Sequence, residues 1–131
     1  MKIKSVRCEV YLREPPPPPT RAVMPPPVKF VTLLASGKIP FTLLRITTDD
    51  GIEGFAFSDK DSLNETAVSE IKEVIIDRDP FDREWIWQRL WYMYGRYGVG
   101  RPPGVRAISA VDIALWDIAG KALGVPIYKL M

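Results

Sequence analysis

The hydrophobic pattern of the chain changes its period once, near residue 62, and this change constrains the fold more than any other feature. Residues 2–12 and 41–58 alternate between the two sides of the chain, which is the period-2 pattern of half-buried strands. From residue 62 onward the apolar residues recur every three or four positions, as they do in amphipathic helices. Strands followed by helices predict an α+β domain.

Three strands are predicted within residues 2–58. Residues 41–48 and 52–57 are joined by Asp49-Asp50-Gly51, which has the composition of a hairpin turn because Gly51 can take a positive φ. Together with the first strand they predict a three-stranded antiparallel β-meander. The residues expected to share one face are Val6, Cys8, Val10 and Leu12 in the first strand, and Glu53, Phe55 and Phe57 in the third.

Three helices are predicted within residues 62–124, as a three-helix bundle after the sheet. The first helix can be capped by Ser62 or Asn64, and Asp82 is a good N-cap for the second. The third helix is expected over residues 105–123, because Gly124 suits a left-handed C-cap and the following proline cannot continue a helix. The apolar stripes are Val68, Ile71 and Ile75, then Ile86, Leu90 and Met93, then Ile108, Val111, Leu115 and Ile118.

Two proline runs, residues 15–19 and 25–27, interrupt the strand pattern. Proline fixes φ and donates no backbone hydrogen bond, so this stretch is neither a helix nor a central strand. A stiff, polyproline-like loop with a five-residue tip is expected, with a disordered linker as the alternative. A long loop inside a small domain is more often functional than idle.

The second predicted helix is unusually aromatic. Core packing accounts for most of its rings, but one helix is too thin to bury four bulky rings on different sides within a domain of this size. Some of this surface is therefore expected to face another chain or domain. The aromatic residues of the segment are Trp85, Trp87, Trp91, Tyr92, Tyr94 and Tyr97.

Composition excludes several classes of function. The chain has 131 residues, 18 basic and 16 acidic side chains and a formal net charge of +2, with the two signs interspersed. A nucleic-acid partner is therefore not expected, and no apolar run is long enough to predict a membrane span. The single cysteine, Cys8, fits a cytoplasmic location. Without histidine, and with one thiol, no zinc site of the Cys/His type is expected.

One segment carries a family resemblance. Residues 107–130 contain Asp-Ile-Ala-Leu-Trp-Asp, then Gly-Lys and Gly-Val-Pro. They resemble the last long helix of the amino-terminal capping domain of mandelate racemase/muconate lactonizing-type enzymes in the enolase superfamily. The hairpin around Gly51 and the order of elements are similar to that family too. The third strand departs from it, since Gly54-Phe-Ala-Phe-Ser58 stands where members often have Gly-Trp-Gly-Glu.

The resemblance implies that residues 1–131 form a single capping domain, without the C-terminal (β/α)7β barrel that would hold Mg²⁺ and the catalytic bases. The full-length enzyme would be a racemase, cycloisomerase or sugar-acid dehydratase that abstracts a proton α to a carboxylate. This chain alone is expected to be inactive, to hold no metal or other cofactor, and to partner the barrel domain and form a homo-oligomer. The alternative is a non-catalytic module, derived from that domain, which self-associates or binds a protein.

The family resemblance also places two loops, residues 15–27 and 58–64, over the mouth of the barrel. Loops in that position exclude water and touch the distal end of the substrate. The expected lid residues are Thr20, Arg21, Met24, Ser58, Asp59 and Lys60. Asp112, Trp116 and Asp117 are interpreted as structural residues that dock the last helix to the barrel or to the sheet. No catalytic residue and no metal ligand is expected in the chain.

Overall fold

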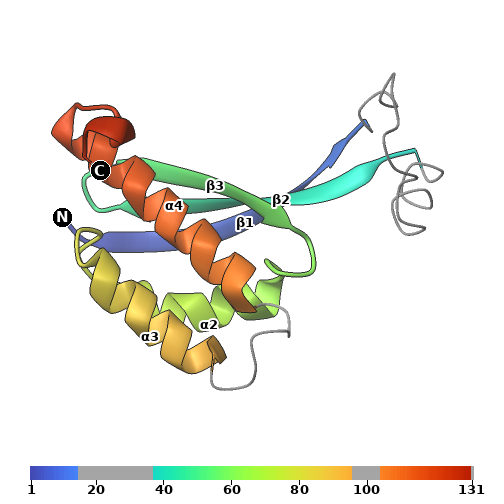
Figure 1. Ribbon diagram of the computed structural model, residues 1–131. Helices are drawn as coiled ribbons and strands as arrows, with labels where there is room; N and C mark the ends of the chain where they lie inside the picture. The colour runs from blue at the N-terminus through green and yellow to red at the C-terminus, as the bar shows by residue number, and fades with distance from the viewer. Residues whose placement is uncertain (15–36, 96–103, 131) are drawn as a thin grey trace, which may run out of the picture.

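The computed structural model describes residues 1–14, 37–95 and 104–130 and confirms the predicted α+β fold. A three-stranded sheet precedes three helices and a short 3₁₀ helix (Figure 1). The predicted proline loop lies outside the described residues. The elements are β1 (Ile3–Arg13), β2 (Ile39–Thr48), β3 (Glu53–Asp59), α2 (Glu65–Ile75), α3 (Arg83–Gly95), α4 (Gly104–Leu123) and η1 (Ile127–Lys129).

The sheet is an antiparallel meander in the order β1-β2-β3. Tyr11 pairs with Phe41 and Phe41 pairs with Asp59, so the end of β1, the start of β2 and the end of β3 lie at the same end of the sheet. At the other end, Gly51 closes the hairpin with a φ of 81°, as predicted from the turn sequence.

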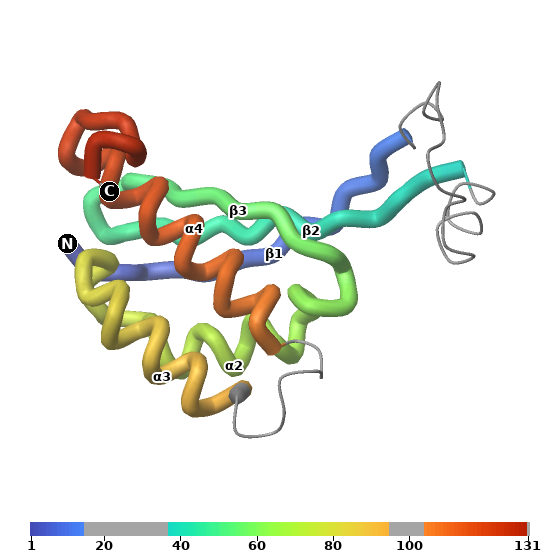
Figure 2. The backbone as a smooth tube through the Cα atoms, viewed as in Figure 1, coloured from blue at the N-terminus to red at the C-terminus, as the bar shows by residue number. Residues whose placement is uncertain are grey.

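The helices cover one face of the sheet (Figures 1 and 2). Helix α4 crosses β3 and β2, α2 lies on β1, and α3 packs against α4 and α2. The predicted stripes of α2 and α4 are buried, and they meet the inward side chains of the sheet to form one core. Its fully buried members include Val6, Leu44, Ile46, Ile71, Ile75, Leu90, Leu115 and Ile118.

The contact between α4 and β3 is exceptionally close at Gly54. A Cβ atom added there would overlap the carbonyl oxygen of Ala114 and lie 2.7 Å from Cγ1 of Ile118. Only glycine allows this approach, which explains why β3 presents Gly54 and Ala56 to the helix and its larger residues to the other face.

The helix ends agree with the capping signals, and the structure resolves one alternative. Asn64, not Ser62, caps α2, since its side chain accepts a hydrogen bond from the Ala67 N–H at 2.9 Å. Asp82 directly precedes α3. After α4, Gly124 takes a φ of 65°, the left-handed conformation expected of a C-cap.

The predicted burial of the first strand is wrong at its far end. Val6 is fully buried and Cys8 is half-buried, but Val10 and Leu12, on the same face, are 53% and 63% exposed. The end of β1 and the start of β2 extend past the helical layer, so none of the described helices lies over them (Figure 1). None of the described helices is long and apolar enough to cross a membrane.

Candidate functional site

The end of the sheet that projects past the helices carries a surface hollow of about 530 Å³. All three strands contribute to it, because the antiparallel register brings the ends of β1 and β3 to the start of β2. The residues that line it are Arg13, Ile39, Pro40, Phe41, Phe57, Ser58 and Asp59.

Three aromatic rings stand next to one another at this end. The Tyr11 and Phe41 rings stack with their centroids 5.7 Å apart, and Phe57 meets Phe41 edge-on at 5.6 Å. Phe57 is 68% exposed, so this aromatic row is open to whatever approaches the end of the sheet. Exposed rings of this kind offer rigid apolar contact area to a ligand or a neighbouring domain.

Asp59 ends β3 and holds the following turn in place. Its carboxylate accepts hydrogen bonds from the N–H and hydroxyl of Ser62, at 2.9 and 2.8 Å. Nη1 of Arg106, in the first turn of α4, forms an ion pair with it at 2.9 Å. Burial opposes ionisation, but the hydrogen bonds from Arg106 and Ser62 outweigh it and lower the pKa of Asp59.

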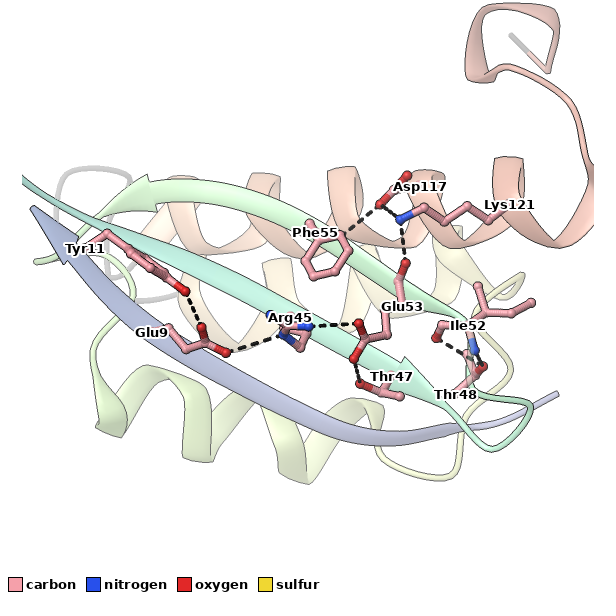
Figure 3. Close-up of polar contacts among 10 residues, drawn as sticks. All are labelled: Glu9, Tyr11, Arg45, Thr47, Thr48, Ile52, Glu53, Phe55, Asp117 and Lys121. Atoms are coloured by element: carbon pink, nitrogen blue, oxygen red, sulfur yellow. Dashed lines mark hydrogen bonds and ion pairs between the residues drawn. The ribbon is translucent and has the colours of Figure 1, made fainter. Parts of the chain in front are cut away.

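A polar ladder crosses the uncovered face of the sheet beside the hollow (Figure 3). The Tyr11 hydroxyl donates to Glu9 at 2.6 Å, and Nη1 of Arg45 donates to Glu53 at 2.8 Å. Nε of Arg45 lies 3.4 Å from the Glu9 carboxylate, as an ion pair without good hydrogen-bond alignment. The hydrogen bond from Tyr11, followed by the charge of Arg45, lowers the pKa of Glu9 and so keeps it ionised.

Helix α4 is attached to the edge of β3 by the last aspartate of the sequence motif. The Asp117 carboxylate accepts a hydrogen bond from the backbone N–H of Phe55 at 3.0 Å and forms an ion pair with Lys121 at 2.6 Å. Lys121 also donates to the Glu53 carbonyl oxygen at 2.7 Å (Figure 3). The predicted docking role of Asp117 is confirmed, and its target is the sheet.

The predicted lid residues divide into two groups. Ser58 is half-buried and lines the hollow together with Asp59, while Lys60 is exposed in the turn that follows. Thr20, Arg21 and Met24 lie outside the described residues. The sequence did not single out Arg13, Phe41 or Phe57 as candidate lid residues, although alternation placed Phe57 on one face of its strand with Glu53 and Phe55. Arg106 carried no signal, since its partner lies 47 positions away.

The described residues contain no group of three or more histidine, cysteine, aspartate or glutamate side chains able to hold a metal ion. Mg²⁺ needs several oxygen ligands, and the acidic group at the hollow, Asp59, is instead paired with an arginine. These residues do not fit a magnesium site, and we assign no metal ligand to them. The arrangement can bind and orient a ligand, and it can exclude water from it.

Comparison with known proteins defines the class. Residues 16–131 match the model of the mandelate racemase/muconate lactonizing enzyme N-terminal domain, and the chain belongs to that family. It is 40% identical over 106 residues to the D-galactonate dehydratase of Pectobacterium atrosepticum. The matched segment covers 77% of this chain and 27% of the relative. It is 39% identical over 95 residues to the D-mannonate dehydratase CC0532 of Caulobacter vibrioides, covering 70% and 23%.

Among solved structures, the D-glucarate dehydratase of Agrobacterium tumefaciens, a complex with magnesium, superposes with a TM-score of 0.76 at 29% identity. The superposition covers 99% of this chain and 32% of that protein. The chain thus spans about a quarter of the length of the two dehydratases it matches in sequence.

Proposed function

We propose that residues 1–131 are the capping domain of a Mg²⁺-dependent acid-sugar dehydratase of the enolase superfamily. The observation that carries the proposal is the 40% identity to a D-galactonate dehydratase, which is supported by the similarity to a D-mannonate dehydratase. These relatives favour dehydration over racemisation or cycloisomerisation. Mg²⁺ and the acid–base groups are assigned to a C-terminal barrel domain, and no chemical step is assigned to the residues described here.

In this proposal the end of the sheet with the hollow faces the barrel mouth. Ser58 and Lys60 would reach the distal hydroxyls or carboxylate of the sugar acid, as would Thr20, Arg21 and Met24 from the other loop. Asp59 would act indirectly, because its carboxylate is already held by Ser62 and Arg106 and fixes the turn that carries Lys60. Such a lid contributes by excluding water and positioning the substrate.

A chimeric enzyme tests the proposal. Residues 1–131 would replace the matching domain of the Pectobacterium atrosepticum D-galactonate dehydratase, and dehydration of D-galactonate and D-mannonate would be assayed with Mg²⁺. We expect turnover from the chimera and none from the 131-residue chain alone. A chimera that is folded by circular dichroism but dehydrates neither acid would contradict the assignment, as would turnover by the isolated chain.

A second candidate function is self-association or binding of another protein through α3, and one observation favours it. Trp85, Trp87 and Trp91 are 43%, 42% and 37% exposed, and the Trp87 and Trp91 rings stack at 5.3 Å. Together with Tyr92 they line a shallow hollow of about 420 Å³. Sizing of the purified chain should then show a dimer or larger assembly, and a monomer at high concentration would argue against self-association.

A further inference from the structure

The two edges of the sheet differ in whether their backbone groups are occupied. At the β3 edge, the Phe55 N–H donates to Asp117. The Glu53 carbonyl there accepts from Lys121, so α4 closes this edge. At the start of β1, the N–H and carbonyl of Ile3 bond to the turn between α2 and α3. No strand within residues 1–14, 37–95 and 104–130 pairs with the outer side of the rest of β1. Such an unpaired edge is a template for another strand.

At its far end, β1 directs the backbone groups of two residues away from the sheet. The Phe55 N–H points out of the sheet, so the residue opposite it on β2, and every second residue from there to Phe41, points its backbone groups toward β1. Tyr11 pairs with Phe41 and therefore faces β2. Val10 and Leu12, on either side of Tyr11, present their N–H and carbonyl groups at the open edge. Their side chains are more than half exposed, so this stretch offers hydrogen-bonding groups and apolar surface together.

The side chains of this stretch are complementary to a second copy of themselves. If two β1 strands pair antiparallel around a two-fold axis at Tyr11, residue 9 of each lies opposite residue 13 of the other. Glu9 then faces Arg13 of the second copy twice, once on each side of the axis. Val10 likewise faces Leu12 twice, on the side of the sheet where the helices lie. Opposite charges and apolar side chains directly across from one another stabilise antiparallel strands.

The aromatic row at the end of the sheet supports the same register. Tyr11 stacks on Phe41, which meets Phe57 edge-on, so Tyr11 ends the row at the open edge of β1. Because its backbone groups face β2, two Tyr11 residues at the axis would form the closer, non-hydrogen-bonded kind of pair, and their rings would join the two rows. The described helices of the two copies would stay apart, since the helical layer stops before this end of β1 (Figures 1 and 2).

We propose that residues 9–13 of β1 pair with the same residues of a second copy of this chain, and that three strands from each copy become one antiparallel sheet. Glu9 and Arg13 set the register, and Val10 and Leu12 supply the apolar contact and the backbone hydrogen bonds. The proposal goes beyond the proposed function and does not rest on it. Its surface lies on the sheet and is distinct from the tryptophans of α3.

Disulfide trapping tests the register directly. Tyr11→Cys, in a Cys8→Ser background, would place two thiols at the axis, where the Cα atoms of a non-hydrogen-bonded pair lie about 4.5 Å apart, within reach of a disulfide. Oxidation with copper phenanthroline should cross-link most of this protein into a dimer on a non-reducing gel. Arg7→Cys in the same background is the matched control. Residue 7 is exposed on the same face but would lie roughly 26 Å from its copy, so this variant should cross-link little.

Charge reversal at Arg13 supplies an independent readout. Arg13→Glu turns both attractive pairs with Glu9 into repulsive ones, so the dissociation constant of the dimer should rise about tenfold. Sedimentation equilibrium measures this constant, and the difference from the wild type should shrink at high salt. Arg7→Glu changes an exposed arginine of the same strand outside the paired segment and should leave the dissociation constant unchanged.

Three results would overturn the proposal. The first is a monomer at every concentration, and the second is equal cross-linking of Tyr11→Cys and Arg7→Cys. The third is a dimer that Arg13→Glu leaves unchanged and Trp87→Ala dissociates, which would show that the copies meet through α3 instead.

Discussion

Asp112 and Asp117 show how two identical residues in one helix can have opposite effects on stability. Asp117 gains a backbone N–H and a lysine on folding, whereas the main effect of folding on Asp112 is burial, which the charge of Arg83 only partly offsets. The folded-state pKa of Asp112 is raised above its unfolded value, so its ionised form opposes folding once the pH rises through that interval.

In the isolated chain at pH 7, Asp117→Ala should lower the free energy of unfolding by about 1–3 kcal/mol, because a charge-assisted hydrogen bond and an ion pair are lost. Asp112→Asn should leave it unchanged or raise it. Urea unfolding followed by circular dichroism measures both values. Equal destabilisation by the two variants would show that the two aspartates do not differ in this way.

Two buried threonines on β2 give a second residue-scale prediction. The Thr42 hydroxyl is buried and has no partner among the described residues, while the Thr48 hydroxyl donates to the Ile52 carbonyl and accepts a hydrogen bond from the Ile52 N–H. Thr42→Val should therefore raise the free energy of unfolding by about 1 kcal/mol, and Thr48→Val should lower it by about 1–3 kcal/mol. The same urea titration distinguishes the two variants. A loss of stability in Thr42→Val would contradict the prediction that its hydroxyl destabilises the fold.

At the scale of elements, the contact between α4 and β3 depends on one glycine. Gly54→Ala should lower the free energy of unfolding by more than about 3 kcal/mol, because the added methyl group overlaps the backbone of Ala114. Gly51→Asn is the control, since a Cβ atom added there would have no atom of the described residues within 4 Å, and asparagine tolerates a positive φ. Thermal unfolding of the two variants compares them, and a stable Gly54→Ala protein would disprove the close approach.

The turn after β3 should make stability depend on pH. The folded-state pKa of Asp59 is lowered, so its contribution is present above the unfolded value of about 4 and is lost as the pH falls through the folded-state pKa. The stability difference between the wild type and Asp59→Asn should therefore shrink below about pH 4. Unfolding measured from pH 2 to pH 6 tests this, with Lys60→Gln in the same turn as the control. A stability difference between the wild type and Asp59→Asn that stays constant over this pH range would contradict the prediction.

The elements themselves could largely be predicted from the sequence, because periodicity, caps and turn residues are local signals. The hairpin at Gly51 and the end of α4 at Gly124 are examples, while for α2 the sequence left Ser62 and Asn64 as alternative caps. The exposure of Val10 and Leu12 could not be predicted, since alternation identifies a face of the sheet but not how far the helices extend over it.

The candidate site was less predictable than the fold. Alternation placed Phe57 on one face of its strand but did not show which face the helices cover. The hollow also needs Arg13 and Phe41, which the register of the sheet brings to it. The pairing of Arg106 with Asp59 joins α4 to the end of β3. Contacts between residues this far apart in the chain depend on tertiary packing, which no local pattern encodes.

At the scale of the whole molecule, the domain has two surfaces with different properties. The end of the sheet is an open hollow with aromatic rings, and the groove between α3 and α4 is lined by two tryptophan rings and four polar side chains. In the proposed enzyme the first surface faces the substrate. The described residues contain no group of side chains able to hold a metal ion, whereas the similar D-glucarate dehydratase is a complex with magnesium, and the proposal therefore assigns Mg²⁺ to the barrel domain.

The substrate-facing role of the sheet end is the central claim, and the chimera provides its most direct measurement. The double variant Ser58→Ala/Lys60→Ala should raise the KM for the acid sugar several-fold, because both side chains are proposed to contact the distal end of the substrate. The control is Ser69→Ala/Lys72→Ala, which changes the same residue types at exposed positions of α2. We predict a higher KM only in the first variant; an unchanged KM in both would contradict the account.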